Sequence, residues 1–171
     1  MNLQKLFFVF LLIVIFTTNT FAQSTATATA TATIIAPITI ANAVDMNFGN
    51  VAIQAGTAGT VVIAPAGTRT RTAGVTLPST TGTFTQASFT VGGEGVYTYA
   101  ITIPSTDYTI TDLISAATMI VNTFTSTPSG TGILTAGAQT LNVGATLNVG
   151  AAQTPGTYTN TTGFDVTVNY N

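Results

Sequence analysis

The chain has 171 residues, of which 46% are hydrophobic and only 5% are charged, and its formal net charge is −2. It contains no cysteine and no histidine, so a thiolate nucleophile, an imidazole base and the usual zinc, haem or iron–sulfur ligand sets are not expected. Three basic residues in no cluster do not predict binding to the phosphates of a nucleic acid.

The first 22 residues have the pattern of a secretory signal peptide. Lys5 precedes an unbroken apolar run over residues 6–16, and residues 20–22 (TFA) offer small side chains at a cleavage site. The apolar run is too short for a membrane-spanning helix, which needs about 20 residues. We therefore expect residues 1–22 to be removed. The mature protein is expected to pass through the periplasm to the cell surface or the medium, with no membrane span after cleavage.

Residues 25–40 alternate strictly, because every even position is apolar. Such alternation predicts a strand with one buried face. At about 3.3 Å per residue the segment would extend roughly 53 Å, whereas strands in globular domains span about 17–20 Å. We therefore predict an extended N-terminal arm over residues 23–33 and a single domain over residues 34–171, with the first strand at residues 34–40.

The arm has three interpretations. It is a donor strand that pairs with another subunit, a disordered Thr/Ala linker, or a strand that bends near Pro37 and returns to its own sheet. In the first interpretation small apolar side chains fill pockets of the partner: Ala26, Ala28, Ala30 and Ala32.

The middle of the chain predicts short strands separated by turns. Residues 61–64 are predicted as a short strand and residues 68–77 as an exposed edge strand. The alternating residues 87–91 and the run 97–103 are predicted to form a β-hairpin across the glycine-rich residues 92–95.

Arg69 and Arg71 fall on the same face of the predicted edge strand. They have two interpretations, a surface contact for an anion or glycan, or charges that discourage pairing of the edge with another chain.

Residues 141–149 hold one apolar parity, with Gly144 predicted at a bulge or a close approach. The last predicted strand alternates to the C-terminus and directs four apolar side chains to one face: Phe164, Val166, Val168 and Tyr170. About eight to ten short strands with no βαβ rhythm predict an all-β fold, a single antiparallel β-sandwich.

Several stretches, in chain order, carry a family resemblance: ATATIIAPITI (30–40), DMNFGNV (45–51), APAGTRT (64–70), NTFTSTPSGTG (122–132), LNVGATLNVGA (141–151), PGTY (155–158) and FDVTVNYN (164–171). They resemble the bacterial family called domain of unknown function 4402. That family is similar to the adhesin and pilin superfamily, which implies an immunoglobulin-like sandwich. In chaperone–usher pilins the subunit lacks one strand, and the N-terminal extension of the next subunit completes it.

The resemblance implies roles for both ends of the chain. The alternating arm is similar to a donor strand, and the strand from Phe164 to Tyr170 is similar to the one that an assembly chaperone grips. Gly156 resembles the glycine that precedes that strand. Two departures are that no disulfide can form and that the arm carries alanines where stronger donor strands carry larger side chains.

The leading hypothesis is a non-enzymatic structural subunit of a pilus or surface fibre. It would associate with itself or a related subunit by β-strand addition, with a periplasmic chaperone as a partner in transit. The alternative is a monomeric secreted or surface module that binds a glycan or protein through Tyr97, Tyr99 and Tyr108, unless these pack in the core.

No catalytic, cofactor-binding or metal site is predicted, because the five acidic residues are isolated in the sequence. Asp107 and Asp112 in particular lack the dense oxygen spacing of calcium loops.

Overall fold

The fold was obtained as a computed structural model and is described for residues 22–171. The chain divides into two units, residues 1–34 and residues 35–171. Residues 22–34, the described part of the first unit, form no strand or helix and are all exposed. The predicted signal peptide lies outside the described residues except for Ala22. All regular structure of the described residues belongs to the second unit, which we call the folded unit.

That regular structure consists of β-strands, as the abundance of threonine, valine and isoleucine favours. Their order is β1 (Thr39–Val44), β2 (Ala52–Ile53), β3 (Gly59–Ile63), β4 (Arg69–Arg71), β5 (Val75–Thr76), β6 (Ala87–Gly92), β7 (Thr98–Thr102), β8 (Tyr108–Asp112), β9 (Thr118–Thr127), β10 (Thr131–Ile133), β11 (Ala138–Val149), β12 (Tyr158–Thr159) and β13 (Thr167–Tyr170). No helix among the described residues is long and apolar enough to cross a membrane.

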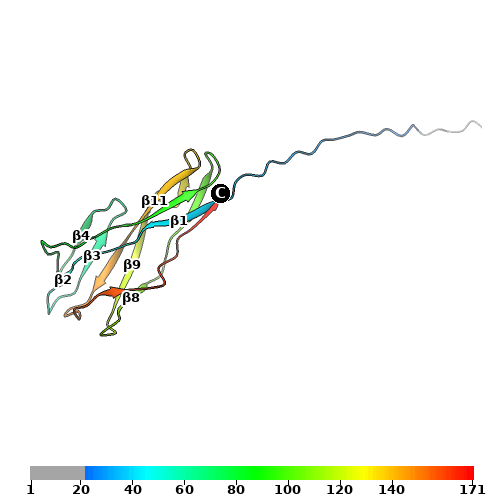
Figure 1. The fold of residues 1–171 in the computed structure, drawn as a ribbon. Helices are drawn as coiled ribbons and strands as arrows, with labels where there is room; N and C mark the ends of the chain where they lie inside the picture. The colour runs from blue at the N-terminus through cyan, green and yellow to red at the C-terminus, as the bar shows by residue number, and fades with distance from the viewer. Residues whose placement is uncertain (1–21) are drawn as a thin grey trace, which may run out of the picture. The chain divides into compact units, whose positions relative to one another are not determined.

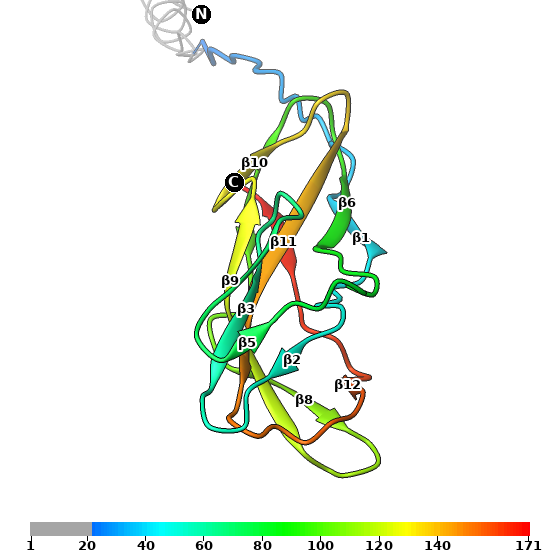
Figure 2. The same ribbon diagram turned by 90° about the vertical axis from the view of Figure 1, so that its left-hand side faces the viewer.

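The larger layer is an eight-stranded antiparallel sheet with β11 at its centre (Figures 1 and 2). Along one path the order is β1-β6-β11-β9-β8-β12. One edge of β11 pairs first with β6 and then with β3, which in turn pairs with β4. Both features predicted at Gly144 are confirmed. The register with β9 shifts between Gly144 and Thr146, as at a bulge, and main-chain atoms of Ile63 and Ala64 lie close to Gly144.

The opposing layer is formed by the short sheets β10-β7-β13 and β2-β5. Side chains of both layers form one core, which includes Val91, Leu141, Tyr99 and Val168. The alternating apolar residues of β11 are all buried, so the parity predicted for residues 141–149 is confirmed. The chain is therefore an all-β antiparallel sandwich.

The predicted β-hairpin between residues 87–91 and 97–103 is wrong. Both strands form, but β6 pairs with β1 and β11, whereas β7 pairs with β10 and β13 in the other layer. The glycine-rich loop crosses from one layer to the other, because Val91 and Tyr99 enter the same core from opposite sides.

The first strand also begins later than predicted. β1 begins at Thr39, after Pro37, which has no N–H for a strand ladder. It pairs with β6 from Thr39 to Val44, with a bulge between Asn42 and Val44.

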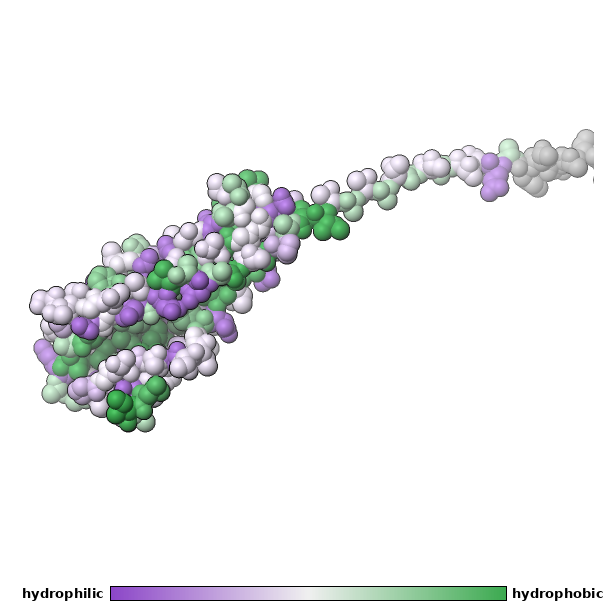
Figure 3. All heavy atoms as spheres, in the orientation of Figure 1, coloured by the Kyte–Doolittle hydropathy of each residue, from purple (hydrophilic) through white to green (hydrophobic). Residues whose placement is uncertain are grey.

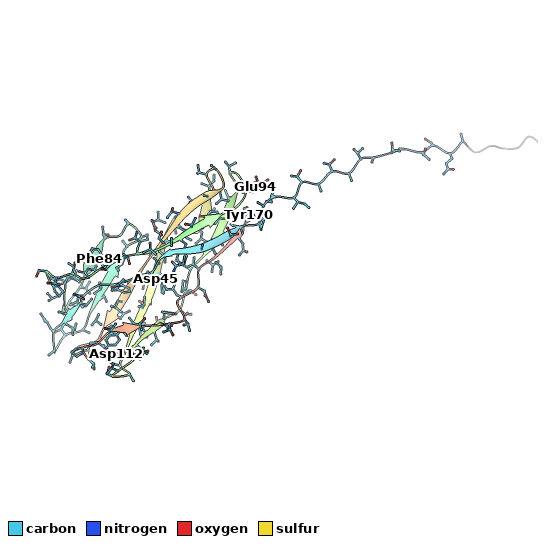
Figure 4. All side chains as sticks on the ribbon, viewed as in Figure 1. Asp45, Phe84, Glu94, Asp112 and Tyr170 are labelled. Carbon is cyan, nitrogen blue, oxygen red and sulfur yellow. The ribbon has the colours of Figure 1, made fainter. Side chains whose placement is uncertain are left out.

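The folded unit has two opposite ends. The entry pole is the end at which the chain reaches β1, and it carries Glu94 and Tyr170 (Figure 4). The hairpin pole is the other end, where residues 113–117 connect β8 to β9 and where Asp112 lies (Figures 1 and 4).

Candidate functional site

The sandwich is open toward the hairpin pole. A cavity of about 1290 Å³ lies between residues 45–55, which follow β1, and residues 152–164, which precede β13. Figure 3 shows this hollow as a green apolar floor between two paler, more polar rims. Ordinary small-molecule pockets occupy about 300–1,000 Å³, so the opening has the size for a length of chain. We call this opening the groove.

The floor of the groove is the inward face of the large sheet. Five of its apolar residues come from β8, β9 and β11: Ile110, Met119, Val121, Leu147 and Val149. At the groove the described chain contributes only the short strands β2 and β12, both of which lie in the rims. Ile110 and Met119 are half-buried there, whereas Val121, Leu147 and Val149 are buried. Among the residues that line the groove Asp45 alone is charged, so the site suits an uncharged, apolar occupant.

The second rim is held in place by side chains. The Asp112 carboxylate accepts hydrogen bonds from the Thr157 N–H at 3.2 Å and from the N–H and hydroxyl of Ser115 at 2.8 and 2.6 Å. The Asn160 amide donates to the Thr109 carbonyl at 2.8 Å. The hydrogen bonds from Ser115, helped by that from Thr157, hold the pKa of Asp112 below its usual value, against the opposing effect of burial.

Part of this rim is available for strand pairing. Residues 164–166, which precede β13, belong to no strand or turn and pair with no described strand. Gly163 before them has a positive φ of 67°, and its carbonyl accepts a hydrogen bond from the Tyr108 hydroxyl. Main-chain groups without a strand partner are what an added β-strand needs for hydrogen bonding.

Phe164 closes the inner end of the groove. Its ring lies 4.9 Å from that of Phe124, 6.1 Å from that of Tyr108 and 6.5 Å from that of Phe89, measured between centroids. Phe164 and Val166 are half-buried, Val168 is buried and Tyr170 is half-buried, whereas β13 itself spans only Thr167–Tyr170. The four side chains share one face, and the first lies at the groove.

Tyr170 and Glu94 form hydrogen bonds with the main chain shortly before β1. The Ala36 N–H donates to Glu94 Oε2 at 3.2 Å, and the Tyr170 hydroxyl donates to the Ala36 carbonyl at 3.0 Å. The same hydroxyl accepts the Glu94 N–H at 2.6 Å. Figure 4 shows the two side chains together at the entry pole. Ala36 is thereby fixed on both sides of its main chain.

The proposed donor residues Ala26, Ala28, Ala30 and Ala32 are exposed and lie in no strand. The arm from residue 23 to residue 33 carries no charge. Its small apolar side chains, spaced two residues apart, match the chemical character of the groove floor.

Arg69 and Arg71 bind their own chain. Arg69 Nη1 donates to the Phe48 carbonyl at 2.7 Å, and its guanidinium lies 4.5 Å from the centre of the Phe84 ring. Arg71 Nη1 donates to the Val75 carbonyl at 2.9 Å. Both arginines therefore form hydrogen bonds that connect segments of the folded unit.

The described residues contain no group of three or more acidic side chains placed to hold a metal ion. The groove itself was not predicted from the sequence. Its rims, residues 45–55 and 152–164, have no apolar alternation sustained over a whole strand, and the available signal was the inward parity of Leu147 and Val149.

The fold and the groove together define an all-β sandwich module with an incompletely covered core. The chain matches the family "Domain of unknown function (DUF4402)" over residues 38–170 and belongs to it. No match was found among curated proteins or among solved structures.

Proposed function

We propose that the protein is an exported, non-enzymatic structural subunit of a surface fibre that assembles by β-strand addition. Residues 24–33 of one copy occupy the groove of the next copy. The observation that carries the proposal is the open apolar groove beside an unpaired rim, in a chain whose N-terminal segment alternates small apolar side chains. Strand addition uses both features, because main-chain hydrogen bonds give affinity and pockets for alternate side chains give register.

Binding in the groove should be favourable for the uncharged arm, because it removes apolar surface from water. Each alanine directed to the floor removes apolar surface from water on both partners, at about 25 cal/mol per Å². The threonines of the opposite face remain exposed, and β-branched residues favour the extended conformation.

The fixed position of Ala36 favours exchange between copies over folding back. The arm leaves the folded unit at the entry pole, and the six residues of β1 separate that point from the first rim of the groove. To reach its own groove the chain would have to reverse direction at Pro37 and lose the hydrogen bonds to Glu94 and Tyr170. A neighbouring copy needs neither change.

Two further partners belong to the same proposal. An immunoglobulin-like, pilin-type subunit with an open groove needs a periplasmic chaperone in transit, because an apolar floor that is only partly covered favours aggregation. A related subunit with a similar arm is a second occupant of the groove. Export rests on the predicted signal peptide over residues 1–22.

The test is electrophoresis in SDS of protein from native cells, unheated and boiled. We expect the unheated full-length chain to give multimers that collapse to a monomer on boiling, and deletion of residues 24–33 to abolish them. A matched pair of variants tests the face: Ala30→Asp should abolish the multimers, since it would bury a charge, whereas Thr29→Asp should retain them.

Multimers that persist without the arm would contradict strand addition by this segment. A full-length chain that is monomeric before and after boiling would favour the binding-module alternative instead. A glycan platform on the predicted tyrosines is weakened by the burial of Tyr99, whose pKa that burial raises, although Tyr97 is exposed.

A further inference from the structure

Apart from Val44 at the end of β1, the large apolar side chains that are exposed in the folded unit lie at its two poles. At the hairpin pole Leu113 and Ile114 are 76% and 97% exposed. At the entry pole Val96 and Tyr97 are 73% and 47% exposed, and Ile133 lies beside them because it pairs with Thr98. Apolar patches of this kind on opposite ends of a charge-poor module mark interaction surfaces.

The turn at the hairpin pole is closed by hydrogen bonds. The Asp112 N–H donates to the Ala117 carbonyl at 2.9 Å, and the Ala116 N–H donates to the Asp112 carbonyl at 2.8 Å. The N–H and hydroxyl of Ser115 both donate to the Asp112 carboxylate. These hydrogen bonds order a turn whose Leu113 and Ile114 side chains are exposed to solvent. A surface that is ordered before binding loses little conformational entropy when a partner covers it.

The entry pole is ordered as well. The Tyr97 ring lies 5.8 Å from the Tyr170 ring, and Tyr170 holds Ala36, the last fixed residue before the arm. Val96 and Tyr97 consequently lie near Ala36, the point from which the arm extends.

The groove sets the direction in which a donor arm must enter. Phe164 closes its inner end, and the entry pole is occupied by the acceptor's own chain at Ala36. The donor's body must therefore stand at the hairpin pole. Its arm then runs antiparallel to the rim of residues 152–164, which leads from β11 at the hairpin pole back toward β13.

We infer that successive copies also meet pole to pole, with Leu113 and Ile114 of the acceptor packed against Val96 and Tyr97 of the donor. The inference rests on the proposed strand addition, which brings one entry pole to each hairpin pole. The two patches differ, so the contact is heterologous and generates an open filament of identical copies. The partner surface is a second copy of this chain.

Cross-linking tests the contact, since the natural chain has no cysteine. A chain carrying both Val96→Cys and Ile114→Cys is treated with a short bis-maleimide, boiled in SDS and separated. We expect a ladder of covalent multimers. The matched control carries Ala66→Cys and Val96→Cys, because Ala66 is exposed in the turn between β3 and β4, away from both poles. It should give no ladder.

The outcomes distinguish the pole-to-pole contact from the strand addition on which it rests. Multimers in unheated samples without a covalent ladder would overturn the pole contact and leave strand addition standing. Monomers in every lane would overturn both.

A second variant guards against poor cross-linking geometry. Ile114→Ser should raise the protein concentration needed for multimers by at least about tenfold, while urea unfolding of the monomer stays unchanged because the side chain is exposed. Unaltered assembly of this variant would count against the contact.

Discussion

At Gly144 the central strand β11 passes so close to the end of β3 that no side chain fits. A Cβ there would collide with the Ile63 carbonyl oxygen and lie 2.8 Å from the Ala64 carbonyl carbon, both of which are main-chain atoms. Gly144→Ala should therefore lower the free energy of unfolding by about 1–3 kcal/mol, the cost of overpacking. Urea unfolding at neutral pH measures the change.

Gly56→Ala is the control for this substitution, because nothing lies within 4 Å of its Cβ position. Its free energy of unfolding should stay within about 1 kcal/mol of the natural protein. Equal effects of the two substitutions would show that the approach of β3 to β11 does not constrain Gly144.

Asp112 couples the second rim of the groove to pH. Its pKa is lowered by hydrogen bonds from Ser115 and Thr157, so its folded-state value lies below that of the unfolded chain, about 3.9. The stabilisation is complete above the unfolded pKa and is lost as the pH falls through the lower folded pKa. Asp112→Asn should therefore destabilise the protein more at pH 7 than at pH 3, as measured by urea unfolding at both values.

Asp165 provides the comparison, because it is exposed in the unpaired chain before β13. Asp165→Asn should change stability little at either pH. A loss for Asp112→Asn that is the same at pH 7 and pH 3 would mean that the charge of Asp112 does not stabilise the rim.

At the scale of elements, local periodicity predicts which residues form strands and which side faces inward. β11 shows this best, because Leu141 through Val149 keep one parity and all are buried on that face. Successive side chains of an extended chain point to opposite faces, so this alternation is the same whichever strand becomes the neighbour.

Partner choice is not local, and for this reason the predicted hairpin was wrong. A glycine-rich loop between two alternating strands is equally compatible with a hairpin and with a crossing between layers. What decides it is distant: the Gly93 N–H donates to the Gly137 carbonyl, and the Gly137 N–H donates to the Gly95 carbonyl. These hydrogen bonds connect the loop to the turn before β11. That turn lies about 40 residues further along the chain, so the residues around β6 do not reveal it.

For a similar reason the sequence predicted the arm but not the groove. The alternation of the arm is visible in the sequence, whereas the groove arises because the described chain covers Ile110 and Met119 only in part. A missing neighbour leaves no pattern in the residues beside it. Only the arrangement of layers reveals that the inward face of β8 and β9 exceeds what the other layer covers.

At the scale of the whole molecule, the proposed assembly makes stability depend on a neighbour. An open groove leaves part of the core apolar surface in water, and an arm that fills it stabilises the folded state by mass action. The gain is about 2.7 kcal/mol when the occupant is present at one hundred times its Kd. The terminal copy whose groove is empty should accordingly unfold more readily than a copy inside the fibre.

A synthetic peptide of residues 24–38 should reproduce this effect on the chain that lacks residues 24–33. At about one hundred times its Kd it should raise the Tm by roughly 5–10 °C, as followed by circular dichroism. The peptide with Ala30→Asp should fail, because the charge would enter the apolar floor, while the peptide with Thr31→Asp should still act. If all three peptides left the Tm unchanged, the groove would not be a site for this segment. If all three raised it equally, binding would not depend on which face the arm presents.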